Sequence, residues 1–267
     1  MNEFDENKKP IPFTARLMAY YRAQESKKEC PLFVDPFAER LAGDLTSYFK
    51  KDESFLINDY PLIRTHYIDE RLLKTWCQTH SNSQIVILGA GLDTRAYRFE
   101  PLQSGNHSVY EIDFPIINQY KQNILKNEDT FCRLERISAD ITNSDWRTLL
   151  LKRGFSKKNP VFWILEGVAY YIQKEEFKDI YDRIINFSDT DNQFFVDICD
   201  PVCAEVDFGP YFGYFKWGLF KEEVEPFFFY NGWKISYCDA EDFDQGRFVG
   251  AGLMIFIHGK RIIKNDE

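Results

Sequence analysis

The sequence predicts a doubly wound α/β fold with a mostly parallel sheet, and three observations lead to this prediction. Short apolar runs rich in β-branched residues recur from residue 85 onward. Helical periodicity fills most of the intervals between those runs. The first eighty residues, in contrast, are dominated by helical patterns. We therefore expect one domain over residues 1–267, with a helical cap over about 1–80 and the sheet over about 81–267.

Three helices are expected in the N-terminal cap. The first begins at Thr14, whose hydroxyl can accept a hydrogen bond from the backbone of the first turn. The second opens at Asp35-Pro36, because proline suits the first turn of a helix, and its apolar face extends to Leu45. The third spans about residues 61–76 and carries apolar side chains at helical spacing.

Five apolar runs are expected to form the parallel strands, and helical patterns connect them. The strands are expected at residues 85–88, 108–112, 135–139, 161–165 and 194–198, with helices at 116–126 and 174–186. Two later runs, 234–238 and 253–258, follow one another without a helix between them. We expect these two to pair as an antiparallel hairpin at the sheet edge.

Composition and charge exclude several classes of function. The net charge is −9, from 33 Lys and Arg against 42 Asp and Glu, so no nucleic-acid partner is expected. No apolar run approaches the ~20 residues that span a bilayer, and residues 1–10 lack an apolar signal segment. Six scattered cysteines suggest free thiols in a reducing compartment. We therefore expect a cytoplasmic protein without a membrane partner.

Open α/β sheets bind ligands at the carboxyl ends of their strands, and the first strand end here is glycine-rich. Gly89 and Gly91 follow the buried run directly, which lets the backbone approach a nucleoside closely. The third glycine of the dinucleotide fingerprint is missing, since Thr94 occupies its place, and Asp93 would repel a pyrophosphate. A nicotinamide-dependent oxidoreductase is therefore only an alternative.

Three later strand ends each carry an acidic residue. Asp113 lies 24 residues after Gly89, close to the spacing of a carboxylate that binds ribose hydroxyls. Asp140 can accept from an adenine amine, although an acid there also suits a helix N-cap. Glu166 ends an apolar run, where it needs a partner such as a ligand ammonium or a nearby arginine. Together these acids fit an adenosine ligand with a cationic centre and no phosphate, such as S-adenosylmethionine (SAM).

Longer motifs occur along the chain in a fixed order. They are Gly89-Ala90-Gly91-Leu92-Asp93-Thr94-Arg95, Glu111-Ile112-Asp113-Phe114-Pro115 and Glu166-Gly167-Val168-Ala169-Tyr170-Tyr171, preceded by Thr14-Ala15-Arg16, Arg22-Ala23, Asp35-Pro36 and Arg64-Thr65-His66-Tyr67-Ile68-Asp69. This series resembles the leucine carboxyl methyltransferase family, and in particular its branch of bacterial polyketide carboxyl methyltransferases. The resemblance implies a class I methyltransferase with a Rossmann-like sheet and SAM as its cofactor.

The resemblance implies a role for each matching residue. Arg64 would bind the methionine carboxylate of SAM, which suits a planar guanidinium, assisted from the first helix by Arg22 or, alternatively, by Arg16. Taken alone, Arg64 would be a surface cation or a partner for Asp69. Asp140 and the backbone of Ile141 would hold adenine. The full cofactor-binding set expected is Arg22, Arg64, Gly89, Ala90, Gly91, Asp93, Asp113, Asp140, Ile141 and Glu166.

The resemblance also implies methyl transfer to a carboxylate or hydroxyl oxygen of a small organic, possibly polyketide-like, acceptor. A carboxylate is already ionised at neutral pH and needs no general base, so we expect no catalytic side chain beyond positioning groups. We expect no metal, because the four histidines form no metal-binding set and Cys199 and Cys203 have no second pair. A phenol would need a base, and His66 or Glu166 would then serve. The substrate-side candidates are Tyr171, Tyr211 and Tyr214.

An aromatic-rich insertion is expected over about residues 203–230, in a chain with 25 Phe and 15 Tyr. It can act as a lid over an apolar acceptor or pack against the sheet, and the sequence leaves both possibilities open. A non-catalytic protein that keeps a SAM pocket and uses these aromatic residues as an interaction surface is the remaining alternative. The oligomeric state is not predicted.

Overall fold

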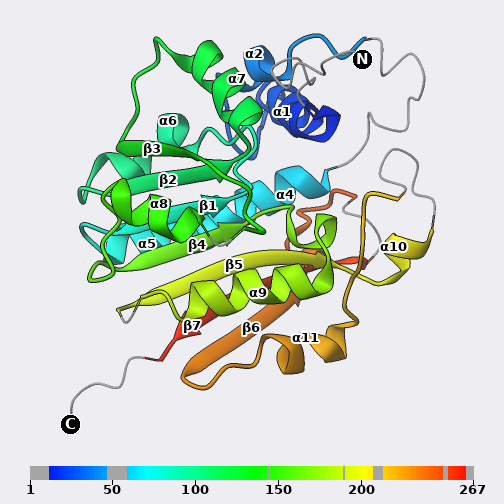
Figure 1. Ribbon diagram of the computed structural model, residues 1–267. Coiled ribbons are helices and arrows are strands. Elements are labelled where there is room, and N and C mark those ends of the chain that lie inside the picture. The colour runs from blue at the N-terminus through cyan, green and yellow to red at the C-terminus, as the bar shows by residue number, and fades with distance from the viewer. Residues whose placement is uncertain are drawn as a thin grey trace, which may run out of the picture.

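A seven-stranded sheet with the order β3-β2-β1-β4-β5-β7-β6 forms the centre of the protein (Figure 1). The computed structural model describes residues 12–46, 59–143, 145–188, 190–206, 213–248 and 252–262. The strands are β1 (Gln84–Leu88), β2 (Ser108–Asp113), β3 (Arg133–Ser138), β4 (Val161–Leu165), β5 (Asn192–Cys199), β6 (Trp233–Asp239) and β7 (Met254–Arg261). Strands β1 to β5 are parallel, and β7 pairs antiparallel with β5 and β6. The predicted mostly parallel sheet with an antiparallel C-terminal hairpin is confirmed.

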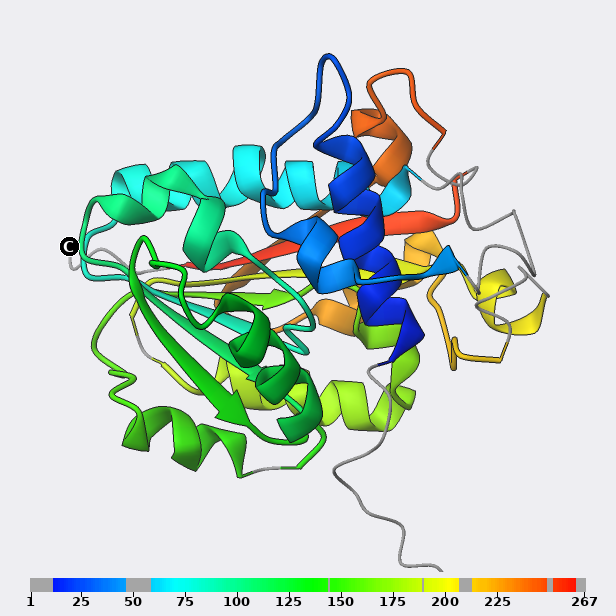
Figure 2. The same ribbon diagram turned by 90° about the horizontal axis from the view of Figure 1, so that it is seen from above.

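Helices cover both faces of this sheet (Figure 2). One face carries a continuous helical segment made of α4 (Tyr60–Tyr67), a π-helical turn (Ile68–Leu73) and α5 (Lys74–Thr79). The opposite face carries α8 (Trp146–Lys152) and α9 (Lys174–Ile185). The other helices in the described ranges are α1 (Phe13–Glu25), α2 (Ala38–Ala42), α6 (Arg95–Arg98), α7 (Pro115–Leu125), α10 (Val202–Glu205) and α11 (Lys221–Phe228).

The central strands explain the position of the crevice. Every residue of β1 and β4 is buried, as expected for parallel strands covered on both faces. β1 pairs with β2 on one side and with β4 on the other, so the chain reverses its direction of travel across the sheet at this point. In open α/β sheets a ligand crevice lies at the carboxyl ends of the strands beside such a reversal.

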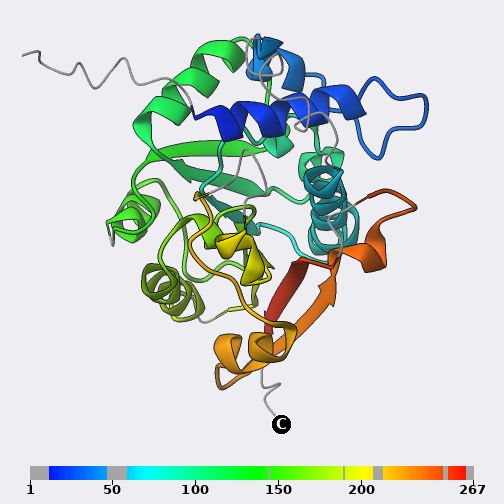
Figure 3. The same cartoon turned by 90° about the vertical axis from the view of Figure 1, so that its right-hand side faces the viewer.

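Helix α1 lies across the carboxyl ends of the parallel strands, close to α2 and α7 (Figure 3). Leu17 and Tyr21 of α1 pack against Leu62 of α4 in a small apolar cluster of their own. The cap is therefore attached to the sheet by packing as well as by the polar contacts described below.

None of the helices in the described ranges has both the length and the apolar character needed to cross a bilayer.

Two expectations about the cap are wrong. Helix α1 begins at Phe13, directly after Pro12, and Thr14 lies inside the helix and makes no capping hydrogen bond. The second helix ends at Ala42 instead of reaching Leu45, because Gly43 has a φ of +59° that terminates it. The third helix exists but extends to residue 79 and includes the π-helical turn.

The sequence patterns also missed two helices outside the cap, α8 and α11, which are only 7 and 8 residues long.

The pairing of β5 with β7 requires a glycine at position 259. Gly259 lies opposite Phe194, and a Cβ atom there would be 2.0 Å from the Phe194 ring. We expect Gly259→Ala to displace this buried ring and to lower the free energy of unfolding by about 1–3 kcal/mol in urea denaturation. Ser236→Ala on the exposed side of β6 is the control, with an expected change within ~0.5 kcal/mol. Equal stability of Gly259→Ala and the wild type would contradict this packing.

Candidate functional site

A cavity of about 560 Å³ lies at the carboxyl ends of β1, β2 and β4, beneath α1. Ten of the residues predicted from the sequence line it: Arg22, Arg64, Gly89, Ala90, Gly91, Asp93, Asp113, Glu166, Tyr171 and Tyr214. They come from α1, α4, the β1 loop, the ends of β2 and β4, and the segment before α11. The fold therefore brings most of the predicted set around one space.

Three other candidates, Asp140, Ile141 and Arg16, are absent from the described lining, and a fourth, Tyr211, is not described. Asp140 and Ile141 are not among the described residues that line the cavity, and the Asp140 carboxylate accepts hydrogen bonds from the Thr142 backbone and hydroxyl at 2.9 and 2.8 Å. Arg16 donates to the carbonyls of Ala42 and Asp44, so Arg22 is the arginine of α1 that lines the cavity. Tyr211 lies outside the described residues.

The glycine-rich loop after β1 is fixed by Asp113. Oδ2 of Asp113 accepts from the Gly91 backbone N–H at 2.6 Å, and Oδ1 accepts from that of Phe114 at 2.7 Å. Gly89 has a φ of +68°, and a Cβ atom there would be 2.6 Å from the Val168 side chain. A Cβ at Gly91 would meet nothing within 4 Å, so this glycine faces open space. Burial raises the pKa of the Asp113 carboxyl although both backbone groups donate to it.

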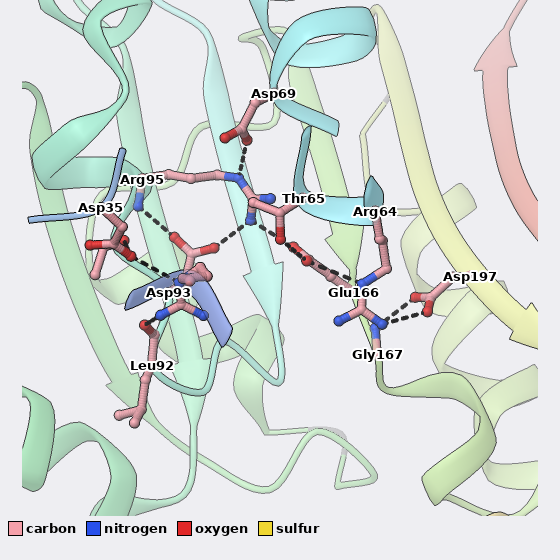
Figure 4. A network of polar contacts seen from close by, with 12 residues as sticks. Asp35, Arg64, Thr65, Asp69, Leu92, Asp93, Arg95, Glu166, Gly167 and Asp197 are labelled. Atoms are coloured by element: carbon pink, nitrogen blue, oxygen red, sulfur yellow. Dashed lines mark hydrogen bonds and ion pairs between the residues drawn. The ribbon is translucent and has the colours of Figure 1, made fainter. Parts of the chain in front are cut away.

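Arg64 is buried at the centre of the site (Figure 4). Its Nη1 donates to Oδ2 of Asp197 at 2.7 Å and to the Tyr170 hydroxyl at 3.1 Å, and its Nε donates to Glu166 at 3.2 Å. None of these three bonds uses Nη2, and Arg64 lines the cavity. A Cβ at Gly167 would be 2.9 Å from both terminal nitrogens, so glycine is required where the β4 loop passes the guanidinium.

Sequence reasoning missed Asp197, the main partner of Arg64. It lies in β5 with no exposed surface and also accepts from the Tyr60 hydroxyl and the Gly167 backbone N–H, both at 2.6 Å. Its carboxylate therefore joins α4 to the loop after β4. The signal available in the sequence was a lone acid within an apolar strand, because a buried charge requires partners.

Glu166 is held by two arginines and a hydroxyl. Its Oε2 accepts from Nη1 of Arg95 at 2.7 Å, and its Oε1 accepts from Thr65 at 2.9 Å and from Arg64. Burial alone would raise the pKa of this carboxyl, but Arg95 and Arg64 outweigh burial and lower the pKa to about 2. A carboxylate with this pKa is a poor proton acceptor. His66, the other base considered, is not among the described residues that line the cavity.

Arg95 links the cap to the strand ends. Its side chain is 2% exposed and contacts Asp69 of the π-helical turn at 2.6 Å, Asp93 of the β1 loop, and Glu166. Asp69 also binds Arg98 at 2.8 Å. The sequence allowed Asp69 as a partner of Arg64, whereas the structure pairs it with these two arginines. The contacts of Arg95 with Asp69, Asp93 and Glu166 are visible in Figure 4.

Arg22 fixes α1 over the glycine-rich loop. Its Nε donates to Asp35 at 2.8 Å and its Nη2 to the Leu92 carbonyl at 2.6 Å. Asp35 is buried and also accepts from the Thr94 hydroxyl at 2.6 Å. The four arginines of this network form ion pairs with five carboxylates. The arginines are Arg22, Arg64, Arg95 and Arg98, and the acids are Asp35, Asp69, Asp93, Glu166 and Asp197.

The described part of the aromatic segment is partly core and partly cavity wall. Trp217 is buried and donates from Nε1 to the Ala169 carbonyl at 2.9 Å. A Cβ at Gly218 would be 2.3 Å from the Cys199 carbonyl oxygen, so this stretch packs directly on the end of β5. Tyr214, in contrast, is 55% exposed and lines the cavity. Within the described ranges, no three His, Cys, Asp or Glu side chains are grouped to hold a metal ion.

The low pKa of Glu166 predicts a specific loss of stability in acid. A carboxyl with a lower pKa in the folded state stabilises the fold above its unfolded pKa, near 4.5, and this contribution is lost as the pH falls toward 2. We expect the unfolding free energy to decrease more steeply between about pH 6 and pH 3 in the wild type than in Glu166→Gln, by at most about 3 kcal/mol.

Urea denaturation at each pH measures this difference. Glu175→Gln, at an exposed position in the first turn of α9, is the matched control and should follow the wild type. Parallel pH profiles for the wild type and Glu166→Gln would contradict the ion pairs assigned to Glu166.

Comparison with known proteins agrees with this geometry. The chain matches the model of the leucine carboxyl methyltransferase family over residues 15–185. A Parafrankia protein named for SAM-dependent methyl transfer is 33% identical over 187 residues, which cover 66% of this chain and 59% of that protein. A Mycobacterium tuberculosis protein of the same designation is 34% identical over 196 residues, covering 67% and 56%. The chain thus spans about three fifths of the length of these curated relatives.

Solved structures share the fold. A DUF574 family protein from Streptomyces avermitilis superposes with a TM-score of 0.63 at 14% identity, covering 93% of this chain and 96% of that one. A Thermobifida fusca protein described as a methyltransferase gives a TM-score of 0.56 at 17% identity, with 97% of each chain covered. The sheet is therefore of the Rossmann-like methyltransferase type. Because the family match runs from α1 to α9 and includes the tips of β1, β2 and β4 around the cavity, the chain belongs to the leucine carboxyl methyltransferase family.

Proposed function

We propose that this protein is a SAM-dependent O-methyltransferase that transfers a methyl group to a carboxylate of a small organic acceptor. The observation that carries the proposal is the charged half of the cavity, where Asp113 and Glu166 flank an open glycine loop and Arg64 keeps Nη2 outside its three intramolecular bonds. This arrangement suits a phosphate-free nucleoside with an amino-acid tail and a positive centre.

The residues fit the cofactor in a defined order along the sheet. Asp113, at the end of β2, would accept from the ribose hydroxyls, and Gly91 leaves open space for the nucleoside. Glu166 would face the methionine ammonium, with Arg64 and Arg22 near the carboxylate. Asp140 and Ile141 follow β3 and would have to turn toward the cavity to hold adenine. Ala90 and Asp93 complete the loop that lines the same space.

The proposed reaction needs positioning and desolvation more than proton transfer. When bound, SAM supplies a methyl group on a sulfonium that an anionic oxygen can attack in line. A carboxylate nucleophile is ionised at neutral pH, so the site needs no general base, in keeping with the low basicity of Glu166. The chain's own contribution is to hold the donor through its acids and arginines and to exclude water with the aromatic wall.

The site residues fit a nicotinamide dinucleotide or a phenol acceptor less well than they fit SAM and a carboxylate. A nicotinamide dinucleotide would meet Thr94 where the third glycine is needed, and the Thr94 hydroxyl is already bound to Asp35. A phenol acceptor would need a proton acceptor, which Glu166 does not supply at neutral pH. Methyl transfer from labelled SAM would exclude a non-catalytic binding protein.

Calorimetric titration with SAM tests the proposal. We expect binding by the wild type, with an affinity reduced at least about tenfold in Asp113→Asn, which removes the charge that accepts from ribose, and in Arg22→Gln. Asp113→Asn keeps the size of the side chain whereas Arg22→Gln shortens it, and circular dichroism checks that both variants fold. Arg40→Gln, whose partner Glu128 is on the surface, is the control and should bind like the wild type. Folded wild-type protein that fails to bind millimolar SAM would refute the proposed function.

A further inference from the structure

The cavity has two chemically different halves. Six charged residues line the half formed by the cap, the β1 loop and the ends of β2 and β4: Arg22, Arg64, Asp93, Arg98, Asp113 and Glu166. The other half lies beside the end of β5 and the start of β7, and in the described ranges no Lys, Arg, His, Asp or Glu lines it. Its wall consists of aromatic and apolar side chains, including Tyr171, Tyr214, Phe215, Leu253 and Met254.

The arginines of the charged half already have partners within the chain. Arg22 pairs with Asp35 at 2.8 Å, Arg64 with Asp197 at 2.7 Å and Arg98 with Asp69 at 2.8 Å. The remaining donors of Arg64 and Arg22 are assigned to the SAM carboxylate in the proposed function, so an additional charged group on an acceptor would lose its hydration without gaining a counter-charge from the described lining. The body of the acceptor should therefore be uncharged.

The aromatic wall is held in place before any acceptor binds. The centroid of the Phe215 ring lies 4.5 Å from the centroid of the Tyr170 ring and 5.3 Å from that of the Tyr171 ring. The Phe215 and Tyr171 rings pack edge to face. The backbone N–H of Lys216 donates to the Tyr170 carbonyl at 2.7 Å, which ties the segment to the loop after β4. Fixed aromatic faces bind flat apolar groups at low entropic cost.

We propose that the acceptor has a planar, aromatic or conjugated body with no charge beyond its nucleophilic group, and that Phe215 and Tyr171 determine this specificity. The inference rests on the proposed function, because the donor must occupy the charged half for the acceptor to occupy the aromatic one. Met254 and Leu253 close this half from the start of β7.

A pair of matched probes tests the charge requirement. Binding of 2-naphthoate and of naphthalene-2,6-dicarboxylate is measured by calorimetry on full-length protein saturated with S-adenosylhomocysteine. The two probes share one ring system and differ by one carboxylate. We expect 2-naphthoate to bind at least about tenfold more tightly, since the second carboxylate would be desolvated without a partner. Equal affinities, tighter binding of the dicarboxylate, or no binding of 2-naphthoate at millimolar concentration would each overturn the inference.

A variant tests the role of the ring. Phe215→Leu keeps an apolar side chain but removes the aromatic face, and we expect it to weaken 2-naphthoate binding about tenfold while SAM affinity stays within about twofold. Phe229→Leu is the control, because Phe229 is 69% exposed and is not among the described lining residues. Unchanged 2-naphthoate affinity in Phe215→Leu would refute the assignment.

The two proposals fail in different ways. Wild-type protein that does not bind SAM would remove the proposed function, and this inference with it. Normal SAM binding without discrimination between the two naphthalene probes would overturn the acceptor class alone and leave the methyltransferase assignment intact.

Discussion

The structure depends on the pairing of charges that are buried where the cap meets the strand ends. The side chains of Arg64 and Asp197 are 6% and 0% exposed and lie 2.7 Å apart. Removal of one partner from such a pair leaves an uncompensated buried charge and typically costs about 3–5 kcal/mol. Arg95 is under the same constraint between Asp69 and Glu166. Because the partners belong to different elements, the cap has to take the position over the sheet in which all of them are satisfied.

The sequence predicts those parts of the fold and site whose signals are local. The apolar runs of the parallel strands are continuous because both faces of the sheet are covered, and their ends are marked by residues such as Gly89 and Asp113. Parallel strands end at the same edge, so acids at several ends converge without any knowledge of side-chain contacts. The bounds of β4 match the predicted ones, and those of the other strands differ by at most three residues at either end. Most of these differences are extensions, because hydrogen-bonded pairing continues beyond the apolar run.

The rest could not be predicted because it depends on contacts between distant segments. Asp197 lies within an expected strand, and its partners Tyr60 and Arg64 are 137 and 133 residues away along the chain. Arg64 and Asp69 are five residues apart, which places them on different sides of a helix and explains why they do not pair. The Asp140 carboxylate accepts two hydrogen bonds from Thr142 in a turn, and the next helix, α8, begins only at Trp146, so Asp140 is not the helix N-cap that the sequence also allowed.

The division of the cavity also bears on the proposed methyl transfer, in which a carboxylate acceptor would need no proton acceptor. Asp113 and Glu166 place negative charge beside the space proposed for the sulfonium nucleoside, and burial limits the screening of that charge by water. Tyr171 and Phe215 provide the opposite environment, in which an anionic oxygen is poorly solvated and therefore more nucleophilic. The proposed reaction needs both halves of the cavity. Without the aromatic half the nucleophilic oxygen would stay hydrated, and without the charged half SAM would not be held in place. The two environments meet in the segment after β4, where Glu166 directly follows the strand and Tyr171 ends the short 3-10 helix Ala169–Tyr171.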